Sequence, residues 1–98
     1  MLLTALLAAA SLAHTPAPEM RVTIRDLDFD RADHVDLFIQ RTRAASRGFC
    51  AEHLGLATPD RMGDPNVCRR GMAMLAVQAL PEPQRAQLAR SGQLRRLR

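Results

Sequence analysis

Polar and apolar side chains alternate over a short stretch in the first third of the chain. The alternation runs through Met20, Arg21, Val22, Thr23, Ile24 and Arg25. A period of two with β-branched residues is typical of a β-strand that buries one face. We therefore predict a short strand from Met20 to Arg25.

Beyond this stretch the apolar spacing becomes that of an amphipathic helix. We predict this first helix from Arg31 to about His53, with the carboxylate of Asp30 as its N-terminal cap. Its inward stripe consists of Val35, Phe38, Ile39, Thr42, Ala45, Phe49 and Cys50.

A second helical pattern follows a segment rich in Pro and Gly. We predict this helix from about Asn66 to Leu80, where Pro81 stops it, and a short third helix over residues 83–92 that Gly92 ends. The inward stripe of the second helix consists of Cys68, Met72, Leu75, Ala76, Ala79 and Leu80.

The two cysteines, Cys50 and Cys68, lie on the inward stripes of these helices. A short connection makes the helices antiparallel neighbours, which brings the end of the first beside the start of the second. We therefore predict a disulfide between Cys50 and Cys68, worth about 3 kcal/mol. The predicted fold is mainly α: a short N-terminal strand, a disulfide-linked antiparallel helical hairpin and a short third helix.

The N-terminal residues 1–13 are almost wholly apolar and carry no charge. This run is shorter than the roughly 20 residues that cross a bilayer. It is typical of a secretory signal peptide cleaved after Ala13, which predicts a periplasmic or secreted protein. We expect a flexible leader over 14–19, one small domain over 20–92 and a basic tail over 93–98.

The composition gives a thin core and a strongly basic surface. The 98 residues include three Phe and no Trp or Tyr, and a chain this short often needs a covalent staple. All 14 basic side chains are Arg, and the net charge is +4. Arginine favours forked contacts to phosphates and carboxylates, but the charge could equally serve solubility. Composition leaves both interpretations open.

Five arginines and no acid follow residue 84. These candidate anion-binding residues are Arg85, Arg90, Arg95, Arg96 and Arg98. A basic segment with interspersed Leu could bind an anionic polymer or membrane surface. A solvated tail is the interpretation that we favour for this end of the chain.

Several catalytic and metal chemistries are disfavoured by the spacing of the side chains they need. A structural zinc site usually has two close pairs of ligands, and here only Cys50 and His53 are close, because Cys68 has no neighbouring ligand. A paired cysteine cannot act as a nucleophile. The aspartates from Asp26 to Asp30 are spaced like calcium ligands, but the sequence lacks the glycine and glutamate that such a loop requires. We predict no catalytic residues, no metal and no cofactor, and hence not an enzyme.

The order of these features resembles the UrcA family of small exported bacterial proteins. The resemblance covers roughly residues 20–80 and rests on a strand that runs into Asp26–Phe29, a helix that carries RTRAASRGFC, and a second cysteine followed by GMAMLAVQAL. It implies an exported or periplasmic protein whose two cysteines pair. It implies no catalytic residue, because no activity is established for the family.

The predicted strand has no second strand to pair with in the chain. An isolated strand leaves a row of backbone donors and acceptors unpaired. We therefore expect a homodimer through Met20 to Arg25, or, as the alternative, an extended segment that lies on its own helices.

The sequence as a whole predicts an exported, non-enzymatic binding or envelope-associated protein with an unknown protein partner. The alternative is a binder of anionic envelope polymers or membrane surfaces through the Arg-rich C-terminus. Nucleic acid is not expected as a partner, because the chain is poor in the aromatic side chains that stack on bases.

Overall fold

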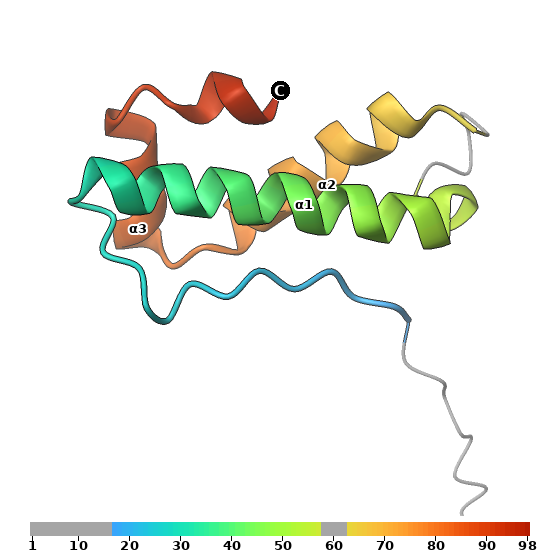
Figure 1. The fold of residues 1–98 in the computed structure, drawn as a ribbon, viewed down its shortest axis with the longest axis horizontal. Helices are drawn as coiled ribbons and strands as arrows, with labels where there is room; N and C mark the ends of the chain where they lie inside the picture. Colours follow the sequence, from blue (N-terminus) through green and yellow to red (C-terminus); the bar gives the residue numbers. More distant parts are fainter. Residues whose placement is uncertain (1–16, 58–62) are drawn as a thin grey trace, which may run out of the picture.

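The computed structural model describes residues 17–57 and 63–98, which form a mainly helical fold (Figure 1). The helices, in chain order, are α1 (Ala32–Ala57), α2 (Pro65–Ala79), α3 (Glu82–Arg90) and the 3-10 helix η1 (Leu94–Leu97). Figure 1 shows α2 returning alongside α1, and an extended N-terminal segment running opposite to α1. The predicted antiparallel helical hairpin is confirmed.

The disulfide between Cys50 of α1 and Cys68 of α2 is present, as predicted. Both cysteines are buried, and their Cα atoms lie 5.9 Å apart. The bond joins the C-terminal half of α1 to the first turns of α2. It closes a loop with a sequence separation of 18 residues.

The start of α1 differs from the prediction. Asp30 does not cap the helix, which begins at Ala32; its Oδ1 instead accepts a hydrogen bond at 2.6 Å from the side chain of Gln87 in α3. The turn before the helix is held instead by Asp28, whose Oδ1 accepts from the Asp30 N–H and whose carbonyl accepts from the Arg31 N–H. The Asp28 N–H in turn donates to Nδ1 of His34 at 2.8 Å. Asp30 therefore fastens the start of α1 to α3.

The cap of α2 is Asp64, two residues before the predicted start of the helix. Its side chain accepts from the N–H groups of Asn66 and Val67, and Pro65 occupies the first turn, where a missing N–H costs nothing. The buried face of α2 is also rotated from the predicted stripe. Leu75 is 55% exposed, whereas Ala73 and Val77 are buried. The apolar spacing of α2 is compatible with burial of either the Leu75 face or the Ala73–Val77 face. The packing of α1 and η1 against α2 buries the Ala73–Val77 face.

The core is small and draws on every element. Its buried members are Phe29, Val35, Phe38, Ile39, Ala73, Val77, Leu80, Leu88 and Leu97. The rings of Phe29 and Phe38 meet edge to face, with centroids 5.3 Å apart. Figure 1 shows α3 crossing the end of the hairpin, where Leu88 enters the core.

The predicted strand from Met20 to Arg25 is not formed within the described chain, although its alternation is confirmed. Met20, Val22 and Ile24 are partly buried, and the residues between them are exposed. The apolar side chains line a shared hollow with Phe38 of α1 and with the end of α2. No strand exists among residues 17–57 and 63–98, so this segment has no partner for a ladder. It is an extended segment that lies on its own helices.

Arg41 holds this extended segment on α1. Its guanidinium makes a forked pair with the carboxylate of Asp26, with both N–O distances at 2.8 Å, and it also donates to the carbonyl of Thr23 at 2.9 Å. Forked pairs of this kind are the most directional contacts between charged groups. Arg41 thus binds the segment to α1 through one side chain, that of Asp26, and one backbone group, the carbonyl of Thr23.

The C-terminal end is not the solvated tail that we predicted. The chain turns at Gly92, whose φ of 73° suits glycine, as expected for the end of α3. It then forms η1, where Leu97 is 4% exposed and belongs to the core. Arg96 pairs with Asp36 of α1, with 2.7 Å between Nη2 and Oδ1. Residues 94–97 are part of the packed structure.

Removal of the disulfide should lower the stability of the fold substantially. We expect Cys50→Ala/Cys68→Ala to lose about 3 kcal/mol of unfolding free energy, because the unfolded chain regains the entropy of the opened loop. Urea denaturation followed by circular dichroism measures this loss. Reduction of the unaltered chain is the control and should give a similar loss. An unchanged midpoint would contradict a structural role for the bond.

The Arg41–Asp26 pair should make the stability of the fold depend on acid pH. The hydrogen bond from Arg41, followed by a backbone hydrogen bond, lowers the pKa of Asp26 from 3.8 to about 2. A lowered carboxyl pKa contributes stability that is fully present above pH 3.8 and is lost as the pH falls through about 2. The urea midpoint should therefore exceed that of Asp26→Asn at neutral pH and converge with it near pH 2. A constant difference across this range would contradict the assignment.

Candidate functional site

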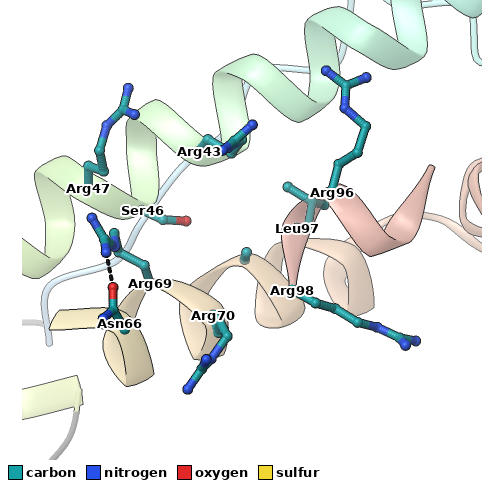
Figure 2. Close-up of a pocket in the computed structure, with 10 residues that line it drawn as sticks. Arg43, Ser46, Arg47, Asn66, Arg69, Arg70, Arg96, Leu97 and Arg98 are labelled. Carbon is teal, nitrogen blue, oxygen red and sulfur yellow. Dashed lines mark hydrogen bonds between the residues drawn. The ribbon is translucent and has the colours of Figure 1, made fainter. Parts of the chain in front are cut away.

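Six arginines surround one hollow of about 280 Å³ between α1, α2 and η1 (Figure 2). Arg43 and Arg47 come from α1, Arg69 and Arg70 from α2, and Arg96 and Arg98 from the C-terminal end of the chain. We call these six residues the arginine cluster. No carboxylate side chain lines the hollow among the residues that the structure describes.

Helical spacing brings these side chains to the same place. Arg43 and Arg47 are four residues apart and therefore share one face of α1. Asn66, Arg69 and Arg70 follow the same rule on the first turns of α2. The disulfide lies beside the arginines of both helices, since Cys50 is three residues from Arg47 in α1 and Cys68 directly precedes Arg69 in α2. The covalent bond therefore keeps the two basic faces next to each other.

The floor of the hollow is buried and mostly apolar. It is formed by Ala73 and Leu97, both nearly inaccessible, and by Ser46. Figure 2 shows the Ser46 side chain in the space between α1 and α2. Its hydroxyl lies 3.6 Å from the sulfur of Met20, with which it hydrogen-bonds. The polar side chains that remain for a ligand are therefore those of the arginines and of Asn66.

Only two guanidinium groups of the arginine cluster are paired within the described chain. Arg96 binds Asp36, and Arg69 donates to the side-chain oxygen of Asn66. The other four have no hydrogen-bond or carboxylate partner among the described residues; they are Arg43, Arg47, Arg70 and Arg98. Like charges gathered without counter-charge destabilise a compact fold, and an anion in the hollow would relieve this repulsion.

The guanidinium groups fan outward from the hollow in Figure 2, with Arg70 and Arg98 pointing away from its centre. The first amides of α2 do not add to the site, because Asp64 already accepts from Asn66 and Val67. The arrangement is thus an open basic surface. It suits a ligand with several separated negative charges better than a single small anion.

The structure divides the five arginines that the sequence singled out. Arg96 and Arg98 belong to the arginine cluster. Arg85 donates to the carbonyl of Gln78 at 3.1 Å and so caps the end of α2. Arg90 lines a separate hollow near Asp30, and Arg95 is exposed. The predicted set is therefore not one site.

Sequence reasoning missed the four helical arginines of the cluster: Arg43, Arg47, Arg69 and Arg70. The signal was available, because Arg43 and Arg47 share a helix face, Arg69 and Arg70 directly follow Cys68, and the predicted disulfide places the two helices together at this point. Only the C-terminal run of arginines was considered as an anion-binding segment.

The cysteines and the described histidines have structural roles. Cys50 and Cys68 are oxidised to each other. The His53 ring stacks at a tilt on Phe49, with centroids 4.9 Å apart, and the Nδ1 atom of His34 accepts from the backbone. Among residues 17–57 and 63–98, no three His, Cys, Asp or Glu side chains gather as metal ligands would.

Comparison with known proteins assigns no identity to this site. The chain matches no protein-family model, no curated protein and no solved structure. Within the described part of the chain, no helix combines the length and the apolar character needed to cross a membrane.

Leu97 should anchor the C-terminal part of the arginine cluster. We expect Leu97→Ala to cost about 2–4 kcal/mol, because it empties a fully packed position. Urea denaturation measures the loss. Arg95→Ala, an exposed change in the same 3-10 helix, is the control and should leave the midpoint nearly unchanged. Equal midpoints for the two variants would show that η1 does not contribute to the core.

Proposed function

We propose that this chain is an exported, non-enzymatic binding protein that holds an anionic envelope polymer on the arginine cluster. The observation that carries the proposal is that four guanidinium groups with no partner among the described residues line one hollow. Arginine binds phosphates and carboxylates through forked hydrogen bonds and stays charged at any physiological pH. A polymer presents many such groups at once, which matches a set of outward-fanned arginines.

A hydrated polymer fits this surface better than a lipid bilayer. Proteins that bind at a membrane interface place exposed apolar side chains beside their basic ones. The exposed large apolar residues among those described are Leu37 and Leu75, and neither lines the hollow. Nucleic acid is disfavoured because stacking needs several exposed aromatic rings. Phe29 and Phe38 are buried in the core, and the half-buried Phe49 stacks on His53.

The location outside the cytoplasm rests on three supports. The apolar run of residues 1–13, which lies outside the described residues, is typical of a signal peptide. A disulfide bond is compatible with an oxidising compartment such as the periplasm. The resemblance to the UrcA family implies the same location, and membership of that family is part of this proposal.

The absence of enzymatic activity is likewise proposed from the chemistry of the described side chains. The cysteines are paired and the two described histidines contact structural partners. A nucleophile needs an adjacent base and an orienting group, and the hollow is lined mainly by arginines, which do not act as bases.

Removal of two arginines from the cluster tests the proposal. We expect Arg43→Gln/Arg47→Gln to weaken binding to long-chain polyphosphate and to alginate by about tenfold, and to lower the salt dependence of binding, because two ion contacts are lost. Arg90→Gln/Arg95→Gln is the matched control, since it removes two exposed arginines outside the cluster that likewise have no side-chain partner in residues 17–57 and 63–98. Isothermal titration calorimetry at several salt concentrations measures both.

Three outcomes would contradict the proposal. Equal losses in the two double variants would mean that net charge alone attracts the polymers. Binding of the unaltered chain to phosphatidylglycerol vesicles, without binding to either polymer, would assign the surface to membranes. Retention of an acidic protein in preference to both polymers would assign it to a protein partner.

A further inference from the structure

A second hollow adjoins that of the arginine cluster. Its volume is about 500 Å³, and its lining comes from the start of α1, the end of α3 and the segment that leads into η1. Arg96 lines both hollows. In Figure 1, η1 lies along α1 between α3 and the first turns of α2, so the two hollows follow each other along α1.

The side chains of this second hollow differ in kind from those of the arginine cluster. Its polar lining includes the amides of Gln87 and Gln93 and the carboxylate of Asp30. Two buried side chains, Phe29 and Val35, give it an apolar wall. An apolar wall with a few converging polar groups is the usual composition of a site for a small molecule or for one unit of a polymer. We call it the amide hollow.

The polar groups of the amide hollow have unused donors and acceptors. Gln87 donates through Nε2 to Oδ1 of Asp30 at 2.6 Å, which leaves Oε1 of Gln87 and Oδ2 of Asp30 without a partner among the described residues. Gln93 accepts through Oε1 from Nη1 of Arg96 at 3.5 Å, and its Nε2 has no partner in the same part of the chain. The hollow thus offers acceptors and a donor together. A hydroxyl group, which both donates and accepts, satisfies such a set.

The charge of the amide hollow disfavours a polymer that is charged at every unit. Asp30 brings a carboxylate, whereas no carboxylate among the described residues lines the arginine cluster. A phosphate beside Asp30 would be repelled, but a hydroxyl would donate to it. The exposed Arg90 also lines this hollow, and Arg90→Gln would leave an amide there that still donates to and accepts from hydroxyl groups.

We propose that the ligand of this chain is an acidic polysaccharide in which neutral sugar units alternate with charged ones. The charged units lie on the arginine cluster, and a neutral unit of the same polymer fills the amide hollow with its hydroxyl groups toward Gln87, Gln93 and Asp30. This inference rests on the proposed function and narrows its ligand from anionic polymers in general to saccharides.

The spacing of the two hollows suits one continuous polymer chain. Val35 of the amide hollow and Arg43 of the arginine cluster are eight residues apart on α1, which is about 12 Å along the helix axis. Arg96 lies between them, bound to Asp36 of the same helix with 2.7 Å between Nη2 and Oδ1. A bound chain therefore passes along η1 from one hollow to the other.

The amide of Gln93 provides the first test, because polyphosphate offers this group no sugar hydroxyl. We expect Gln93→Ala to weaken binding of a hyaluronan oligosaccharide by about fivefold, through the loss of a hydrogen bond. Binding of a linear polyphosphate with the same number of charges should not change. Isothermal titration calorimetry at one fixed salt concentration measures both. Gln78→Ala, which removes an exposed amide outside both hollows, is the control and should change neither.

The carboxylate of Asp30 provides the second test, in which the ratio of the two affinities changes. Asp30→Asn keeps an acceptor for Gln87 and for a hydroxyl but removes the charge that repels phosphate. It should shift the ratio of the two dissociation constants toward polyphosphate by about fivefold. Glu82→Gln is the matched control, since it removes an exposed acid of α3 that lines neither hollow. It should leave this ratio unchanged.

The outcomes separate this inference from the proposed function. Equal losses of both probes in Gln93→Ala, or a ratio that Asp30→Asn leaves unchanged, would overturn the saccharide assignment and leave the arginine cluster as a site for polyanions in general. Binding of polyphosphate without binding of the oligosaccharide would do the same. Binding of neither probe to the unaltered chain would overturn the proposed function, and this inference with it.

Discussion

The bond between Cys50 and Cys68 holds together two surfaces that charge would separate. Arg43 and Arg47 on one side and Arg69 and Arg70 on the other raise the electrostatic energy of the docked hairpin. The core that opposes this repulsion is thin, with Phe38, Ile39 and Leu88 as its largest fully buried side chains. A covalent link of about 3 kcal/mol is a large share of a typical stability of about 5–15 kcal/mol. The helical pair and its basic surface therefore depend on the same bond.

Two further contacts extend this scaffold at its ends. Arg41 ties the extended segment to α1 through Asp26 and Thr23. Arg96 ties η1 to α1 through Asp36. Both are arginines that carry out a structural role with a carboxylate partner. The arginines of the cluster that have no carboxylate partner among the described residues are the ones to which we assign the proposed binding role. The placement of the few acids therefore separates the structural arginines from the others.

Local patterns predicted the helices and their pairing, while long-range packing decided which faces are buried. Two cysteines on facing helix ends were sufficient for the disulfide, because the loop between them is short. The burial of Ala73 in place of Leu75 was not predictable, since it depends on where η1 packs. The same contact explains Leu97, which the sequence places in a charge run that resembles a solvated tail. A β-strand and an isolated extended segment show the same alternation of buried and exposed side chains. They differ only in whether a second strand is present to form backbone hydrogen bonds.

The candidate site shows a related limit of sequence patterns. Arg96 and Arg98 were found because they are close to each other in the chain. Arg43 and Arg69 lie far apart in sequence and become neighbours only when the hairpin forms. A site whose residues come from two helices can be recognised in the sequence only once it is known which faces of the two helices contact each other.

The unpaired guanidinium groups have a thermodynamic consequence for the folded state itself. The two helices that carry them are brought together only in the folded chain, so a polyanion that binds the cluster, as proposed, would stabilise the folded form by mass action. Folding and ligand capture would then be linked equilibria, and the occupied protein would resist thermal and proteolytic attack better than the empty one. In a compartment rich in anionic polymer, the ligand would act as a counter-ion that completes the fold.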